Sequence, residues 1–451
     1  MLYNWLFARG EDGRVVLRFE DTDTERSTDT AIEQALRVFA WLGIDWDAGP
    51  YRQTERFDLY RAAAAELEQS GEAYRCYCTA EELKLERERR SAENLPLIYG
   101  GRCRNLSAEQ RAGFEAEGRS FALRLKVPET GVTAITDVVR GPVEWDNALL
   151  GDHIIMRTDG TPTYQFANPF DDIDMGVTHV IRGEDLLSST PRQLALYTAL
   201  GAEPPIYCHL PMVLGPDRKR LSKRHGAVSV EEFRDRGVVA DALINYVALL
   251  GWSFDDHTNF MTRDELVARF SLERVTAAPG VFDVEKLEWL NGEHLRAMSP
   301  EAFVDAVLDH LEWRGSQLAA QPERVRQAAA LVQEKLRVLD QFEGMCGFLF
   351  GPVDVDPDAW AKVAATPEAA RSLAAARSQL GAVARWQADQ IEAALRAACE
   401  SEGLKPRVLY APVRVAITGS TVSPGLYESL ELLGEGESLA RIDAALARLG
   451  V

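Results

Sequence analysis

Two apolar segments that run directly into charged residues constrain the fold of this 451-residue chain more than any other feature. Residues 14–19 read RVVLRF and are followed by EDTD, while residues 178–185 read THVIRGED. Both segments have the character of buried strands, and each is followed by a segment with helical periodicity. In open α/β sheets, ligands bind at the carboxyl ends of such strands. The pattern therefore predicts an α/β fold with a parallel sheet and a ligand site at its charged edge.

The helices between these strands are predicted from signals at their ends. Thr30 and Glu33 have the spacing of a capping box, and Gly43 provides a C-terminal stop. A second amphipathic helix is expected at residues 57–67. A third is expected to begin at the Thr-Pro pair at 190–191, because proline suits the first helical position.

A change of pattern from about residue 107 to residue 150 indicates an insertion between the two βα regions. Residues 121–126 alternate as a strand does, and residues 136–144 read as a β-ribbon. Residues 153–166 are predicted to form a hairpin around an Asp-Gly turn. After residue 227 the pattern becomes helical, and from about residue 300 it is helical almost throughout.

Composition limits the class of protein and its compartment. Hydrophobic residues make up 46% and charged residues 27% of the chain, as in ordinary soluble globular proteins. No apolar run reaches the roughly 18–20 residues that a bilayer crossing needs, and no signal peptide is recognisable. Six cysteines in so long a chain are too few for a disulfide framework, so we expect a reducing, cytoplasmic location. The net charge of −20 argues against non-specific coating of nucleic acid, although local basic patches can still bind it.

Three of the cysteines cluster in the sequence. Cys76 and Cys78 form a C-x-C pair, and Cys103 follows twenty-five residues later. This is a plausible zinc half-site that needs a fourth ligand, for which Tyr99 is the first candidate and Asn105 a poorer one. The alternative is a set of reduced structural cysteines without metal.

The most basic stretch of the chain is DRKRLSKRHGA at residues 217–227. It follows an apolar strand, and lysine and arginine at such a place suit a phosphate-bearing ligand. The alternative is a solvated basic turn. Its core, RLSKR at 220–224, resembles the KMSKS loop of class I aminoacyl-tRNA synthetases, in the KLSKR form typical of glutamyl-tRNA synthetases.

Further segments resemble the same family in the same order along essentially the whole chain. They are LRFEDTD at 17–23, WLGIDWD at 41–47, DGTPTY at 159–164, HVIRGED at 179–185, LINYVALLGW at 243–252 and RVAITG at 414–419. The resemblance implies a class I Rossmann-like catalytic domain with a parallel sheet, an inserted α+β subdomain that binds zinc and the acceptor stem, and an all-α anticodon-binding domain. The implied boundaries are 1–75 and 151–227 for the two catalytic parts, 76–150 for the insertion, 228–300 for a helical stem-contact region and 301–451 for the anticodon-binding domain.

The resemblance also implies an activity: L-glutamate is activated by ATP, accompanied by Mg²⁺, and then transferred to tRNA(Glu). We expect no membrane partner and a monomer. The implied catalytic residues are Lys223, Arg220 and Ser222. The implied ATP-binding residues are Lys223, Asp185, His209 and Met212. The implied glutamate-binding residues are Glu20, Tyr164 and Arg182, and the implied metal ligands are Cys76, Cys78, Tyr99 and Cys103.

Several of these roles have a structural alternative. Glu20 and Asp185 occupy positions where a carboxylate can instead cap a helix or join an ion pair. Arg337, Arg407 and Arg414 are candidate phosphate contacts for tRNA, although a surface arginine is more often simply solvated.

One departure from the family concerns the amino terminus. The family's first strand and HIGH signature, whose histidines would contact the ATP phosphates, are expected upstream of Asn4. The chain is therefore expected to be N-terminally truncated, and the alternative function is a catalytically impaired tRNA-binding protein. A glutamyl-queuosine-type relative would lack the helical residues 300–451, and a glutaminyl-tRNA synthetase would carry β-barrels there.

Overall fold

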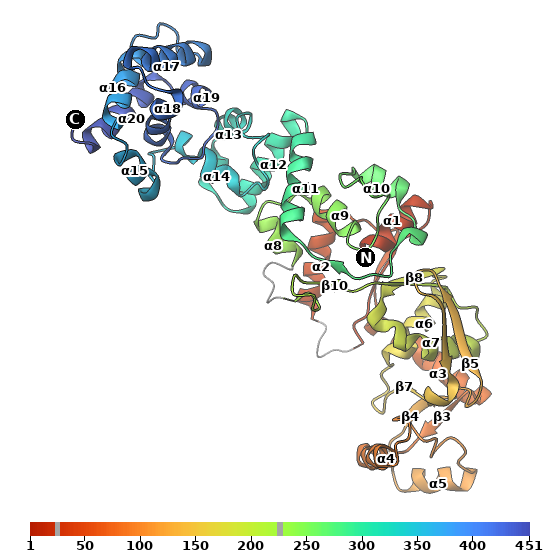
Figure 1. Cartoon of the computed structure of the whole chain (residues 1–451). Coiled ribbons are helices and arrows are strands. Elements are labelled where there is room, and N and C mark those ends of the chain that lie inside the picture. Colours follow the sequence, from red (N-terminus) through yellow and green to blue (C-terminus); the bar gives the residue numbers. More distant parts are fainter. Residues whose placement is uncertain (23–27, 223–228) are drawn as a thin grey trace. The chain divides into compact units, whose positions relative to one another are not determined.

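The computed structural model describes residues 1–22, 28–222 and 229–451 (Figure 1). The chain divides into two compact units, one formed by Met1–His225 with Ile244–Phe282 and the other by Gly226–Leu243 with Asp283–Val451. In the described part of the chain, no helix has the length and apolar character needed to cross a membrane.

The first unit mixes helices and short strands. Its strands are β1 (Val16–Phe19), β2 (Ala48–Arg52), β3 (Ala73–Cys76), β4 (Ala122–Leu125), β5 (Val132–Asp137), β6 (Gly141–Asp146), β7 (Ile154–Met156), β8 (His179–Gly183), β9 (Ile206–Leu210), β10 (Val213–Leu214) and β11 (Gly280–Val281). Its helices are α1 (Leu2–Gly10), α2 (Asp29–Leu42), α3 (Phe57–Ser70), α4 (Ala80–Ala92), α5 (Ala108–Ala116), α6 (Tyr164–Asp174), α7 (Thr190–Ala199) and α10 (Arg263–Arg269).

The strands pair as the α/β prediction requires. β1 pairs with β2, β8 with β9 and β10 with β11, all in parallel. The inserted segment is antiparallel instead: β4 lies between β3 and β7, and β5 and β6 form a hairpin. The predicted parallel fold and the predicted strands at 121–126 and 136–144 are thus confirmed.

Local signals placed several helix ends correctly and one incorrectly. Gly43 ends α2 in the left-handed conformation with φ of 63°, which glycine adopts without steric cost. The start of α2 is different from the prediction, because its N-cap is Thr28, whose hydroxyl accepts a hydrogen bond from the backbone N–H of Ala31. Proline lies in the first turn of α7, as predicted.

The hairpin predicted at residues 153–166 is wrong in its second half. β7 forms, but only Met156 and Pro162 make a bridge across the turn, and helix α6 begins at Tyr164. The helix prevails because its inner face, including Phe166 and Ala167, is fully buried against the core of the unit. Burial of an apolar face outweighs local strand propensity.

A buried carboxylate ties α6 to α3. Asp171 is fully buried and accepts hydrogen bonds from Tyr60 at 2.8 Å, Arg56 at 2.9 Å and Gln53 at 3.1 Å. Two of these donors are neutral and one is charged, so the buried charge is both paired and hydrogen-bonded. This arrangement fixes the helix that carries Tyr164 and Asn168.

The second unit is helical, as the periodicity predicts. Its helices are α8 (Val230–Asp235), α11 (Val284–Ala297), α12 (Pro300–Trp313), α13 (Pro322–Ala329), α14 (Gln341–Cys346), α15 (Pro357–Ala364), α16 (Ala369–Leu380), α17 (Ala388–Glu402), α18 (Pro406–Thr418), α19 (Leu426–Leu433) and α20 (Glu435–Arg448). Helix α9 (Ala240–Ala248) contains the boundary between the units.

A single amide organises the start of the second unit. Asn291 of α11 is fully buried; its carbonyl oxygen accepts from the N–H of Val239 at 2.8 Å, and its amide group donates to the carbonyl of Arg337 at 2.6 Å. It also donates to the carbonyl of Gly237 at 3.4 Å. One side chain thus holds together three backbone segments that are far apart in sequence.

Candidate active site

The centre of the candidate site is Arg182, near the carboxyl end of β8. Its guanidinium donates to Gln193 Oε1 at 2.7 Å and to Thr190 Oγ1 at 2.8 Å, both on α7. Its Nε–H donates to the Nε2 atom of His209 on the neighbouring strand β9, at 3.1 Å. Two longer contacts, to the hydroxyl of Tyr164 at 3.5 Å and the carbonyl of Leu186 at 3.4 Å, complete the set.

All five acceptors around Arg182 are neutral. Among the described residues no carboxylate forms an ion pair with it, so its positive charge is oriented but not neutralised. The two longest contacts exceed the usual 2.7–3.2 Å range and are easily exchanged. A partly buried guanidinium of this kind is well suited to pair with the carboxylate of a ligand in bidentate fashion.

Glu20 and Tyr164 belong to the same site. Tyr164 contacts Arg182, and Asn168, one turn farther along α6, donates to Glu20 at 2.5 Å. Burial raises the pKa of Tyr164, with a further contribution from the charge of Glu20. The structure therefore brings together the three residues predicted to bind glutamate.

The carboxylate of Glu20 is open to solvent on one side and enclosed on the other. Its side chain is 44% exposed, yet the surrounding protein desolvates it enough to raise its pKa, while Arg18 acts in the opposite direction. Arg18 in turn pairs with Asp172 of α6 at 2.9 Å. The site thus presents a carboxylate and a guanidinium of opposite charge, and Tyr164 lies close to both.

The residues predicted to bind ATP are only partly described. Asp185 pairs with Arg220 at 3.7 Å, and both side chains are largely exposed. The backbone N–H of Met212 donates to Glu184 at 3.0 Å. Ser222 is exposed and is the last described residue of the basic segment, while Lys223 lies outside the described residues.

Before Ser222 the basic segment turns back on β10. The N–H of Leu221 donates to the carbonyl of Val213 at 3.1 Å, and the N–H of Gly215 donates to the carbonyl of Lys219 at 2.8 Å. Arg218 occupies the turn with φ of 57°, in the left-handed region. The predicted strand followed by a cationic turn is present up to this point.

The side chain of His209, one of the residues predicted to bind ATP, is held by other protein groups. Its side chain is fully buried, and its Nδ1 lies 2.6 Å from Asp137 Oδ2. Because its Nε2 accepts from Arg182, both ring nitrogens are occupied by protein groups. Asp137 lies seventy-two residues away in the β5–β6 hairpin and belongs to no motif that would predict it from the sequence.

The predicted metal ligands converge. The sulfurs of Cys76, Cys78 and Cys103 all lie within 4.8 Å of one another, and Cys78 and Cys103 are 3.5 Å apart. The hydroxyl of Tyr99 lies 3.5 Å from Cys76 and 3.7 Å from Cys78. Contacts with the other two thiols lower the pKa of Cys76 and raise that of Cys78, while burial raises the pKa of Tyr99.

These distances fit a four-ligand cage. A tetrahedral ion with metal–sulfur bonds of about 2.3 Å separates its sulfur ligands by roughly 3.8 Å. Asn105, the poorer candidate, is exposed, whereas Cys103 is buried in the cluster. The guanidinium of Arg124 stacks 3.9 Å above the ring of Tyr99 and fixes its orientation.

The arginines predicted to contact tRNA in the second unit differ in their exposure and in their partners. Arg337 and Arg407 are exposed. Arg414 is not a free surface cation, because it donates to the carbonyl of Pro424 at 2.9 Å and to the hydroxyl of Ser423, and burial lowers its pKa. Its contacts indicate that it ties the loop after α18 to that helix.

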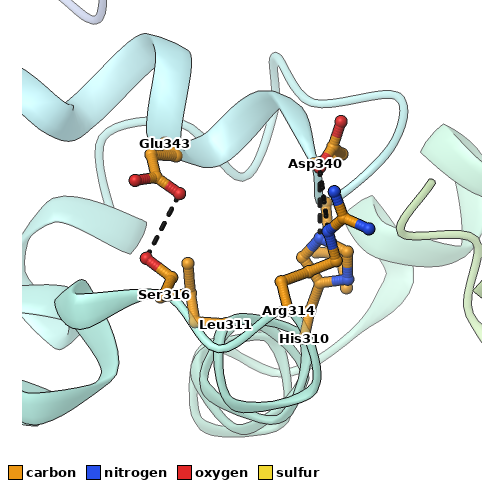
Figure 2. Close-up of a pocket in the computed structure, with 7 residues that line it drawn as sticks. His310, Leu311, Arg314, Ser316, Asp340 and Glu343 are labelled. Atoms are coloured by element: carbon orange, nitrogen blue, oxygen red, sulfur yellow. Dashed lines mark hydrogen bonds and ion pairs between the residues drawn. The ribbon is translucent and has the colours of Figure 1, made fainter. Parts of the chain in front are cut away.

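A small cavity of about 140 Å³ in the second unit contains none of the predicted site residues (Figure 2). Ser316 donates to Glu343 at 3.2 Å on one side, and Asp340 lies 3.8 Å from both Arg314 and His310 on the other. Burial lowers the pKa of His310. The polar groups that line the cavity pair with each other. The cavity is not part of the site around Arg182.

Comparison with known proteins identifies the family. Residues 1–289 match the family described as tRNA synthetases class I (E and Q), catalytic domain, and residues 302–446 match that described as anticodon binding domain. The chain is 42% identical over 457 residues to a glutamate–tRNA ligase of Moorella thermoacetica, an alignment that covers 98% of this chain and 93% of the relative. The chain belongs to the glutamate–tRNA ligase family.

Other members of the glutamate–tRNA ligase family agree with this assignment. A glutamate–tRNA ligase of Saccharopolyspora erythraea is 44% identical over 465 residues, covering 99% of this chain and 92% of the relative. The crystal structure of a glutamate tRNA ligase from Elizabethkingia meningosepticum in complex with its amino acid superposes with a TM-score of 0.87 at 29% identity, covering 99% of this chain and 95% of that one. The predicted class I catalytic domain with parallel strands and the predicted helical anticodon-binding domain are confirmed. The expected amino-terminal truncation is not borne out by these alignments.

Proposed function

We propose that this chain attaches L-glutamate to tRNA(Glu) in the cytoplasm, as a monomer, in two ATP-dependent steps. In the first step a carboxylate oxygen of glutamate attacks the α-phosphate of ATP, which releases pyrophosphate and gives glutamyl-adenylate. In the second step the 3′-terminal adenosine of the tRNA takes the glutamyl group and releases AMP. The first step needs little proton transfer by the protein, so positioning and charge stabilisation carry it. In the second step the attacking ribose hydroxyl loses its proton as the leaving AMP phosphate takes the electron pair of the broken bond.

The observation that carries this proposal is the environment of Arg182. A guanidinium held by five neutral acceptors keeps its charge available for the side-chain carboxylate of glutamate. Glutamine presents an amide with a donating NH₂ at the same place, and its discrimination follows from the loss of one acceptor and of the charge. Glu20, enclosed on one side, would bind the substrate ammonium group.

The ATP-binding role is proposed for the opposite side of the sheet edge. Asp185 would contact the ribose, backbone groups of the segment 209–212 would flank the adenine, and Lys223 with Arg220 and Ser222 would stabilise the pyrophosphate. The exposed ion pair between Asp185 and Arg220 is compatible with this role, because exposed partners can exchange for a ligand. Mg²⁺ bound to ATP would neutralise part of the phosphate charge.

We also propose that zinc is held by Cys76, Cys78, Cys103 and Tyr99. The convergence of three sulfurs and one hydroxyl supports this ligand set, and a closed set of four protein ligands is typical of a structural site. Zinc would hold the loop of residues 99–103 against β3, within the inserted subdomain at 76–150. The helical region 228–300 would contact the tRNA stem, and residues 301–451 would bind the anticodon.

The exchange of labelled pyrophosphate into ATP tests the first step. The full-length chain is incubated with ATP, Mg²⁺, tRNA(Glu) and either glutamate or glutamine. Glutamate-dependent exchange, together with acid-labile charging of tRNA(Glu), is the expected result. Tight binding of tRNA(Glu) without exchange would instead favour the catalytically impaired tRNA-binding protein.

A further inference from the structure

Asp137 makes an unusual set of contacts for a residue in a hairpin turn. It is 1% exposed and lies at the end of β5, which packs beside β9. Its Oδ1 accepts from the backbone N–H groups of Val139 and Arg140, each at 2.9 Å. Its Oδ2 accepts from the backbone N–H of His209 at 3.1 Å and lies 2.6 Å from that residue's Nδ1.

These contacts define the state of the His209 ring. Burial acts to raise the pKa of Asp137, but the hydrogen bonds from His209 and the turn outweigh it and lower the pKa, so Asp137 is a carboxylate. A carboxylate at 2.6 Å requires Nδ1 to carry a proton and donate it. The lone pair of Nε2 then accepts the Nε–H of Arg182 at 3.1 Å, with the hydroxyl of Thr190 also 3.2 Å from Nε2.

The ring therefore links a buried negative charge to Arg182 without placing that charge beside it. Arg182 and His209 are register partners on the parallel strands β8 and β9, which sets their side chains next to each other. A carboxylate in direct contact would form an ion pair with the guanidinium and compete with a substrate carboxylate. An imidazole anchors the same N–H and leaves the charge uncompensated.

We propose that Asp137 and His209 are positioning residues for glutamate recognition, which hold Arg182 in the orientation that pairs with the substrate carboxylate and thereby set its preference for glutamate over glutamine. This inference rests on the proposed function of the site. Neither residue touches the substrate; Asp137 acts through His209, and His209 acts through Arg182.

The competing role for Asp137 is seating of the hairpin. Asp137 also fixes the turn through two backbone N–H groups, so its loss disturbs β5 and β6 as well as the ring. Thr133→Val is a matched control, because the hydroxyl of Thr133 donates to Asn147 Oδ1 at 2.6 Å, within the same inserted region. This variant weakens the hairpin and leaves the ring of His209 and its partners in place.

The test measures pyrophosphate exchange by the full-length chain at varied glutamate, glutamine and ATP concentrations. Asp137→Asn and His209→Gln are each expected to raise the KM for glutamate about 10- to 100-fold, the effect of one hydrogen bond to a charged group. The KM for ATP is expected to change less than about threefold, and the ratio of kcat/KM for glutamate to that for glutamine is expected to fall. The double variant is expected to lose no more than the worse single variant, because both residues act along one path.

Equal changes in the KM for glutamate and for ATP would overturn the inference, as would the same glutamate defect in Thr133→Val. Additive losses in the double variant would also overturn it. If Asp137→Asn does not fold, His209→Gln provides the same test, since the side chain of His209 lies between Asp137 and Arg182 in the chain of hydrogen bonds. Absence of glutamate-dependent exchange in the unchanged chain would instead overturn the proposed function, which separates the two failures.

Discussion

Replacing Arg182 by lysine tests whether the fork of the guanidinium, and not only its charge, recognises the substrate. Five N–H contacts reach five acceptors in the structure, whereas a lysine ammonium offers three donors on one atom. At least two acceptors therefore lose their donor. His209 Nε2 and Thr190 Oγ1 are both buried, and they lie 3.2 Å from each other, so the threonine hydroxyl can still donate to the ring when the guanidinium is gone.

The size of the effect follows from these contacts. A carboxylate that now receives one N–H where the fork supplied two loses a charge-assisted hydrogen bond of about 1.5–3 kcal/mol, so the KM for glutamate should rise about 10- to 100-fold. A buried acceptor left without a donor costs about 1–3 kcal/mol, so the free energy of unfolding should fall as well. The KM for ATP should stay within about threefold, because the substitution retains the charge and lies on the glutamate side.

Pyrophosphate exchange at saturating ATP and varied glutamate gives the first quantity, and urea unfolding gives the second. Arg61→Lys is the control: Arg61 is exposed, forms a surface ion pair with Asp58 at 2.8 Å and lies 5.9 Å from the ring centre of Phe57, contacts that a lysine can also make, so neither quantity should change. A glutamate KM within threefold of the unchanged chain, in a folded Arg182→Lys variant, would refute the bidentate pairing. A defect equal for ATP and glutamate would show that the substitution acts through the fold.

Three further predictions concern other parts of the chain. Cys103→Ser should reduce bound zinc from about one ion per chain to nearly none, measured by elemental analysis, because a closed cage loses one of four ligands. Asn291→Leu should lower the free energy of unfolding by about 2–4 kcal/mol in urea, because it removes buried hydrogen bonds to Val239 and Arg337. Burial lowers the pKa of His153 from 6.5 to about 3, so this side chain stays neutral in the folded chain while the unfolded chain takes up a proton below pH 6.5. The contribution of His153 to the free energy of unfolding is therefore complete above pH 6.5 and declines as the pH falls toward 3. Between pH 7 and pH 5 the free energy of unfolding should fall by about 2 kcal/mol through His153, and this pH-dependent loss should be absent in His153→Phe.

Each of these predictions has a control elsewhere in the chain. Cys399→Ser lies far from the cluster in sequence and should retain zinc; equal zinc in Cys103→Ser and the unchanged chain would exclude the cage. Gln390→Leu changes an exposed amide and should leave the unfolding free energy unaltered. His257→Gln alters an exposed histidine, and an acid sensitivity that survives His153→Phe would place its origin elsewhere.

Much of the fold could be predicted because the signals were local. Gly43 ends α2 and Gly71 ends α3, each in a left-handed conformation that glycine tolerates best. The strand ending at Gly183 and the proline in the first turn of α7 were equally readable. Thr28 was missed as the cap of α2 because Thr30 and Glu33 offered the same pattern two residues later, and only the packing of the helix decides between the two positions.

The charged residues of the candidate site could be predicted from the sequence, but the residues that orient them could not. Tyr164, Arg182 and Glu20 were found because they occur within recognisable motifs, and the structure brings them together. The carboxylate of Asp137 carries no such motif, and its contact with His209 depends on how a hairpin packs on a strand seventy-two residues away. A contact between residues so far apart in the sequence depends on tertiary packing, which the hydrophobic periodicity of a segment does not report.

The β5–β6 hairpin has a consequence for anyone who exchanges modules between relatives of this chain. It attaches to the catalytic sheet through the side chain of Asp137, through the N–H of Val138, which donates to the carbonyl of Tyr207 at 3.0 Å, and through the ion pair of Arg140 with Glu184. A graft that cuts the chain at the ends of the inserted segment would carry half of each contact with it. Donor and recipient therefore have to match at both halves, or the transplanted hairpin will leave the histidine ring without its carboxylate.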